Sequence, residues 1–97
     1  MDYIFHPSAK QELNKAVDYY EDCQKGLGKE FLEEVYSTIQ RIIEFPNAWM
    51  QFSDNAYRCL TNRFPFGIIY QIVDDKTIRI VAIMHLHKNP DYWKERE

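Results

Sequence analysis

The segment from His85 to Lys88 is the part of the chain best suited to acid–base chemistry. His85 and His87 are two residues apart and so share one face of a strand, and Lys88 follows them directly. An imidazole gives up or accepts a proton near neutral pH, so either histidine could act as a general acid or base. The alternative is structural, with His85 hydrogen-bonded at a sheet margin and His87 exposed. We expect no metal and no cofactor, because no Cys, Asp or Glu completes a ligand set at a recognisable spacing.

Two aromatic residues, Tyr92 and Trp93, lie in the otherwise polar tail that begins at Lys88. Beside a lysine, an exposed pair of rings could stack on a nucleic-acid base or anchor a protein partner. The same pair could equally fold back and cap a sheet. The sequence leaves both interpretations open.

Arg58 and Arg63 flank a predicted strand. A guanidinium group suits both phosphate and carboxylate, so these arginines could face a charged partner or pair with acidic helices of the same chain. Acidic side chains are concentrated at Glu30, Glu33 and Glu34. We expect them to form a solvated helix face, because no second acidic cluster is placed to oppose them as a catalytic pair.

The first half of the chain must supply a strand and two helices. Residues 3–5 are aromatic and β-branched, which predicts a short strand. Ser8 is the predicted N-cap of a helix over residues 8–24, and residues 26–28 break the helical pattern. Apolar residues then keep a 3.6-residue period up to Glu44. We therefore expect a helical hairpin.

The second half changes to a two-residue period. Residues 46–55 are predicted to form a loop that tucks its aromatic side chains under the helices. Residues 57–62, 66–73 and 77–85 each read as a strand, and short turns connect them. The predicted fold class is α+β, with an N-terminal strand, a helical hairpin and a three-stranded antiparallel sheet that has the helices on one face.

The last strand shows most clearly which face should meet the helices. Its continuous apolar face is predicted to pack against the helices and consists of Ile78, Ile80, Ala82 and Met84. The opposite face is half polar and is expected to be partly open; it carries Arg79, Val81, Ile83, His85 and His87.

Length and charge limit the possible functions. The 97 residues leave room for one domain, 1–97. The net charge is −3; residues 1–56 carry five basic and ten acidic side chains, and residues 57–97 carry seven and five. A non-specific nucleic-acid binder needs a strongly basic surface, because each phosphate contact requires a Lys or Arg. The balance argues against that class but leaves room for a local cationic face in the second half.

Compartment and redox state follow from what the sequence lacks. No apolar run approaches the ~20 residues that span a bilayer. The acidic start Met1-Asp2-Tyr3 has no basic signal-peptide region. We therefore expect a cytoplasmic protein without a membrane partner. Cys23 and Cys59 match no metal-binding or redox spacing and are expected to be reduced.

Six phrases spread over nearly the whole chain carry a family resemblance: FHPSAKQEL, YYED, GLGKEFLEEV, FPNAW, RCLTNRFPFGIIYQI and HKNPDYW. Their most specific combination is a proline-led first helix, an Arg-Phe-Pro-Phe turn before the central strand and the closing HKNPDYW. In this combination the chain resembles the RelE/ParE superfamily of toxins from bacterial toxin–antitoxin systems. It is more similar to the ParE-like branch, often labelled plasmid stabilisation proteins, than to RelE.

The resemblance implies the toxin of a type II toxin–antitoxin pair. Such a toxin is held inactive by a cognate antitoxin protein, whose disordered segment folds into an apolar groove and covers the cationic surface. ParE-like members are associated with poisoning DNA gyrase, whereas RelE-like members cut messenger RNA on the ribosome without a metal. We expect the ParE-like activity. The alternatives are a metal-independent endoribonuclease and a decayed toxin retained as an antitoxin-binding module.

RelE-like cleavage needs a group that activates a 2′-hydroxyl, cations around the phosphorane and an acid for the leaving oxygen. By resemblance, the first strand lysine of RelE corresponds to Arg58, the second to Leu60 and the central-strand arginine to Gly67. Two of these three cations are therefore missing. This loss favours the binding toxin over the nuclease.

Towards the C-terminus, a later RelE arginine falls near His87 or Lys88, and the RelE tyrosine falls near Tyr92. If the chain is a nuclease, the catalytic candidates are Arg58, His85, His87, Lys88 and Tyr92. The candidates for contact with the target or the antitoxin are Arg63 and Trp93.

Overall fold

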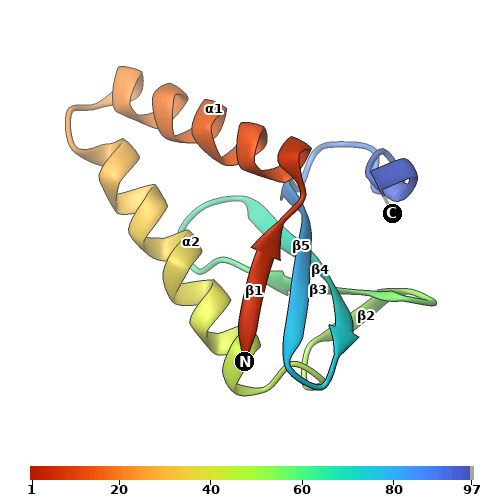
Figure 1. Ribbon diagram of the computed structural model, residues 1–97. Helices are drawn as coiled ribbons and strands as arrows, with labels where there is room; N and C mark the ends of the chain where they lie inside the picture. Colours follow the sequence, from red (N-terminus) through yellow and green to blue (C-terminus); the bar gives the residue numbers. More distant parts are fainter. Residues whose placement is uncertain (97) are drawn as a thin grey trace.

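The computed structural model describes residues 1–96 and contains two long helices and a five-stranded mixed sheet (Figure 1). The α+β class and the N-terminal strand followed by two helices are as predicted, but the sheet is larger. The elements are β1 (Asp2–Phe5), α1 (Pro7–Cys23), α2 (Leu27–Glu44), β2 (Met50–Ser53), β3 (Ala56–Leu60), β4 (Phe66–Asp74), β5 (Thr77–His85) and the 3₁₀ turn η1 (Lys94–Arg96).

Helix α1 begins one residue earlier than predicted. Pro7 lies in its first turn, where the missing N–H of proline is not needed. Nδ1 of His6 accepts a hydrogen bond from the backbone N–H of Ser8 at 3.0 Å. His6, not Ser8, is therefore the N-cap. Histidine is not among the residues that usually cap helices, which explains why the sequence favoured Ser8.

The turn between the helices is held by a carboxylate of α1. The two oxygens of Glu21 accept hydrogen bonds from the N–H groups of Gly26 at 2.9 Å and Gly28 at 3.1 Å, where α2 begins. Gly26 has a positive φ of 87°, which glycine adopts without strain. At Gly28 a Cβ would lie 2.6 Å from the carbonyl oxygen of Val17, so glycine is required where the helices approach.

The sheet has the strand order β1-β5-β4-β3-β2. Strand β1 belongs to the same sheet as the predicted antiparallel strands, where it pairs with β5 in parallel. The predicted loop over residues 46–55 contains the edge strand β2, which pairs with β3 and turns at Asp54 and Asn55. A four-residue strand between Asn, Asp and Pro carries too little periodicity to be recognised from sequence.

A β-bulge in β5 changes which residues face the helices. Ile69 pairs with Ala82 and Tyr70 with Ile80, so Val81 is the extra residue. One inserted residue moves every later side chain to the opposite face. The prediction for this strand was therefore right for Ile80 and wrong beyond the bulge.

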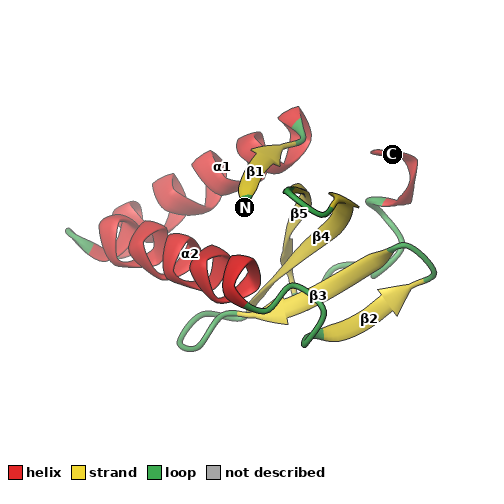
Figure 2. Ribbon diagram, turned by 60° about the horizontal axis from the view of Figure 1, so that its bottom comes forward, coloured by secondary structure: helices red, strands yellow, loops and turns green. Residues whose placement is uncertain are grey.

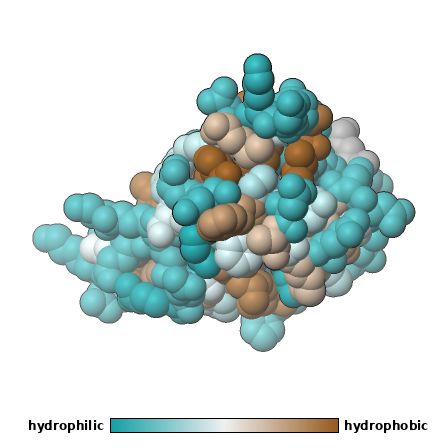
Figure 3. Space-filling view, turned by 90° about the horizontal axis from the view of Figure 1, so that it is seen from below, coloured by the Kyte–Doolittle hydropathy of each residue, from teal (hydrophilic) through white to brown (hydrophobic). Residues whose placement is uncertain are grey.

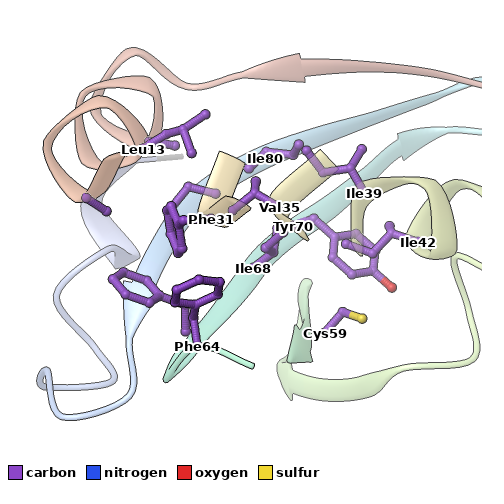
Figure 4. Packing of buried hydrophobic residues seen from close by; sticks show 14 of the residues in the cluster. Leu13, Phe31, Val35, Ile39, Ile42, Cys59, Phe64, Ile68, Tyr70 and Ile80 are labelled. Carbon is purple, nitrogen blue, oxygen red and sulfur yellow. The ribbon is translucent and has the colours of Figure 1, made fainter. Parts of the chain in front are cut away.

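The larger core cluster lies between the helices and the sheet, which has both helices on one side (Figure 2). Phe31 is central, with its ring 5.1 Å from that of Phe64 and 4.9 Å from that of Phe66. Ile80 and Cys59 reach the cluster from the sheet (Figure 4). No helix within residues 1–96 is long and apolar enough to cross a membrane.

A smaller cluster lies on the other face of the sheet. Ala82 and Met84, predicted to meet the helices, belong to it together with Val81. Trp93 of the tail covers them and is only 1% exposed. Its ring centroid lies 6.0 Å from that of Phe52 in β2. Of the two interpretations left open for Trp93, the structure shows the sheet cap, and this face is less open than predicted.

Candidate functional site

The bulge in β5 separates the predicted catalytic residues. His85 pairs with Phe66, whose ring packs in the helix-side core. Arg58 pairs with Ile69, which belongs to the cluster on the opposite face. Arg58 and His85 therefore project from opposite faces of the sheet and do not meet at one phosphate.

Three of the candidates do gather in one hollow, which we call the α1 groove. It has a volume of about 520 Å³ and lies between α1 and the end of the sheet. Its lining includes Lys15, Tyr19 and Tyr20 of α1 and Phe66, His85, Lys88 and Tyr92. The groove is thus mainly aromatic, with positive charges at its margin.

His85 is fixed in this groove by its neighbours. Its ring meets that of Phe66 edge-on at 5.1 Å between centroids. Its Nδ1 accepts the backbone N–H of His87 at 3.1 Å, and its carbonyl accepts that of Lys88 at 3.0 Å. A neutral imidazole that accepts at Nδ1 carries its hydrogen on Nε2. His85 therefore presents a hydrogen-bond donor, while the ring of His87 lies 5.1 Å away at an exposed position.

Tyr92 is a packing residue with a polar tip. Lys88 Nζ lies 4.8 Å from the centre of its ring, and the guanidinium carbon of Arg96 lies 4.9 Å away. Burial, followed by the nearby Glu12 carboxylate, raises the pKa of Tyr92 well above its usual value. This raised pKa keeps the phenol protonated at neutral pH.

An ion pair that the sequence did not reveal closes the edge of β5 beyond β1. Nη1 of Arg96 lies 2.7 Å from Oε1 of Glu12, and Nη2 lies 3.1 Å from Oε2. Arg96 also donates to the carbonyl of Val81, while Glu12 accepts the N–H of Ile83. These side chains satisfy backbone groups that a neighbouring strand would otherwise pair. Only proximity in the fold could reveal a contact between the first helix and the tail.

Arg63 pairs with α2, which is one of the two alternatives left open by the sequence. Its Nη1 lies 2.9 Å from Oε1 of Glu30. Oε2 of Glu34 accepts the backbone N–H of Arg63 at 2.8 Å and that of Phe64 at 3.4 Å. Glu30 and Glu34 are therefore not simply a solvated face, because they hold the turn that precedes β4.

Arg58 lies in a second hollow, the α2–β3 pocket, with a volume of about 400 Å³. The guanidinium carbon of Arg58 lies 4.8 Å from the centre of the Phe52 ring. Its stem crosses Gly67, where an added Cβ would lie 3.1 Å from two of its carbons. The pocket is lined by Arg41, Trp49, Met50, Arg58, Leu60, Thr61 and Asn62.

Within residues 1–96, no three His, Cys, Asp or Glu side chains are grouped so that they could hold a metal ion. Cys23 is exposed and Cys59 is buried, and both are free thiols. Burial raises the pKa of Cys59, which suits a core residue better than a nucleophile.

The family of the chain follows from a match over most of its length. Residues 3–90 match the family described as the ParE toxin of the type II toxin–antitoxin system parDE. The chain belongs to the ParE toxin family. This confirms the ParE-like branch of the resemblance.

Among solved structures, this ParE-family chain is similar to one described as the chromosomal ParDE TA system from P. aeruginosa. The TM-score is 0.63 at 17% identity, and the match covers 90% of this chain and 97% of the other. At this identity the likeness concerns the fold alone. No curated protein matches the chain by sequence.

Proposed function

We propose that this ParE toxin acts by binding DNA gyrase and does not cut RNA. The observation that carries the proposal is the separation of the candidate catalytic residues. Arg58 lies on one face of the sheet, whereas His85 and Lys88 line the α1 groove on the other side. Metal-free phosphoryl transfer needs several fixed positive charges around one phosphate, and losing one well-placed donor commonly costs about 10²–10³ in rate.

Two reconstituted assays test this function. With purified ribosomes and messenger RNA, we expect no codon-dependent cleavage. With purified gyrase and supercoiled plasmid, we expect inhibition of supercoiling together with double-strand DNA cleavage. RNA cleavage without an effect on gyrase would reject the proposal.

A specific observation favours the runner-up, a ribosome-dependent endonuclease. His85, Lys88 and Tyr92 share one groove, so a donor, a cation and a ring are close together. If RNA cleavage is found, His85→Ala or His87→Ala should abolish it while the melting temperature stays unchanged. Cleavage that is indifferent to both variants would remove these histidines as catalytic candidates.

We further propose that a disordered segment of the cognate antitoxin folds into the α1 groove. Aromatic side chains line the groove, and Tyr19 remains 65% exposed at its wall. Burying such a surface lowers the heat capacity of the complex. Calorimetry with the antitoxin should therefore give nanomolar affinity and a large negative heat-capacity change.

A matched pair of variants locates this contact. Tyr19→Ala should weaken antitoxin binding by about 30-fold, as expected for an aromatic residue that dominates an interface. Val73→Ala is the control, because Val73 is 51% exposed on β4 and does not line the groove. Equal affinities for the two variants would place the antitoxin elsewhere.

A further inference from the structure

The α2–β3 pocket is lined by two arginines, Arg41 and Arg58. Arg41 donates through Nη2 to the hydroxyl of Thr38 at 3.1 Å and to the carbonyl of Leu60 at 3.2 Å. Within residues 1–96, neither Arg41 nor Arg58 forms an ion pair, whereas Arg63 and Arg96 do. No carboxylate of the described residues therefore neutralises the positive charge of the pocket.

Hydrogen-bond donors in the same pocket are also unused. The guanidinium group of Arg58 donates no hydrogen bond to another residue in the described part of the chain, and its Nε is buried. The indole Nε1 of Trp49 is likewise buried without an acceptor. Among the described residues three buried side-chain donors have no partner; two of them, on Trp49 and Arg58, belong to this pocket, and the third is Nε1 of Trp93 under the tail. Buried polar groups in proteins are nearly always paired, so two such donors at one site indicate that an acceptor from outside belongs there.

Two exposed apolar side chains line the pocket beside the arginines. Met50 is 53% exposed and Leu60 is 45% exposed. Figure 3, which views the molecule from below Figure 1, shows apolar areas set among polar ones on that face. Arginine, tryptophan and methionine are enriched in the centres of protein interfaces. Nucleic-acid sites instead carry a row of lysines and arginines, and no lysine lines this pocket.

We propose that the α2–β3 pocket is the surface by which the toxin docks on its protein target. The occupant is a segment that carries a carboxylate next to an apolar side chain. The carboxylate accepts from the guanidinium group of Arg58, and the apolar side chain packs on Leu60 and Met50. This inference rests on the proposed function as a binding toxin and assigns it a contact surface separate from the α1 groove.

Charge variants at Leu60 test the docking surface in cells. Leu60→Asp places a carboxylate beside the arginines and should repel the partner, whereas Leu60→Lys removes the same apolar group without that repulsion. When each variant is induced, Leu60→Asp should abolish growth arrest and Leu60→Lys should retain more of it. Val73→Asp is the matched control, because Val73 is similarly exposed, at 51%, on a strand and lies outside the pocket.

Purified components distinguish the possible outcomes. Arg58→Gln keeps the stem over Gly67 but removes the charge, and it should weaken gyrase binding by about 30-fold while antitoxin affinity and melting temperature stay unchanged. Growth arrest by Leu60→Asp at the wild-type level would overturn the docking surface. Loss of antitoxin binding in either variant would assign the pocket to the antitoxin and also overturn it. If the wild-type toxin arrests growth without affecting gyrase, and Leu60→Asp abolishes that arrest, gyrase is rejected as the target but the docking surface is supported.

A photo-reactive benzoylphenylalanine at position 60 tests the class of partner. Irradiated with purified gyrase and with purified ribosomes in separate reactions, it should crosslink to gyrase protein. Crosslinks to ribosomal RNA in place of gyrase would show a phosphate site and overturn the proposal.

Discussion

On one face of the sheet, the two amphipathic helices α1 and α2 cover a core of aromatic and β-branched side chains. On the other face, the tail after β5 turns back and covers a smaller cluster mainly with Trp93. The helices are long and joined by a short turn, whereas the tail, as far as residue 96, has only a single 3₁₀ turn. The first face is therefore covered by structure that forms locally, and the second by a segment that depends on the finished sheet.

The same contrast separates the two candidate surfaces. The α1 groove lies where the helical layer meets the end of the sheet, and Glu12 of the Glu12–Arg96 pair lines it. The α2–β3 pocket includes residues of both β2 and β3, together with Arg41 of α2. Among the described residues, Arg41, Trp49 and Arg58 have unused charge or unused donors and line the second hollow, whereas the unpaired Nε1 of Trp93 is buried under the tail.

The largest effect is expected on the helix side. Ile80 is fully buried there, so Ile80→Ala should lower the free energy of unfolding by about 2–5 kcal/mol through lost burial and a residual cavity. Urea melts measure the loss, and Lys88→Ala, at an exposed position, should cost less than about 0.5 kcal/mol. The reverse order would show that the faces of β5 have been misassigned.

The Glu12–Arg96 pair comes next. Its side chains are only 19% and 17% exposed, and Glu12 also accepts the N–H of Ile83. Glu12→Gln should therefore cost about 1.5–3 kcal/mol, the range for hydrogen bonds to charged groups. Glu30→Gln is the exposed counterpart, with side chains 46% and 59% exposed, and should cost at most about 1 kcal/mol in the same melts. Equal losses would mean that the tail is not held by this pair.

Trp93→Ala should have a smaller effect than its burial suggests. The tail can detach without opening the helix-side core, so we expect about 1–2 kcal/mol, in the lower part of the usual range for point substitutions. Amide hydrogen exchange should show faster exchange in β2 and at the end of β5, with α1 and α2 unchanged. A loss as large as that of Ile80→Ala, spread over the whole molecule, would show that the two faces unfold as one unit.

Much of the fold could be predicted because its signals are local. The helical hairpin follows from a 3.6-residue period interrupted by glycines, and Ile78 and Ile80 follow from a two-residue period. The two-residue period no longer gives the correct face after Val81, where the strand has a bulge. No residue type in the sequence marks this bulge. Ala82 and Met84 are apolar and would suit the core on either face of the sheet, so their residue types do not indicate which face they occupy. Their side depends on pairing with β4, which is a property of the assembled sheet.

The candidate site was only partly predictable for the same reason. His85, Lys88 and Tyr92 lie close together in the sequence, and the structure gathers them in one groove. Arg58 and Arg63 have the same side-chain chemistry, but the carboxylates of α2 reach Arg63 alone. Residue type therefore identified which side chains could carry charge. The neighbours supplied by distant segments determine which of them remain available.

The pairing of strand β1 constrains the order in which the parts of the toxin fold. Its first paired residue, Asp2, lies against Thr77, so the opening segment of the chain has no strand partner until β5 has left the ribosome. The helical hairpin, whose contacts are local, can form long before that point. We expect the growing chain to carry a folded hairpin and an unfinished sheet. An antitoxin made at the same time could then meet the toxin before its binding surfaces are complete.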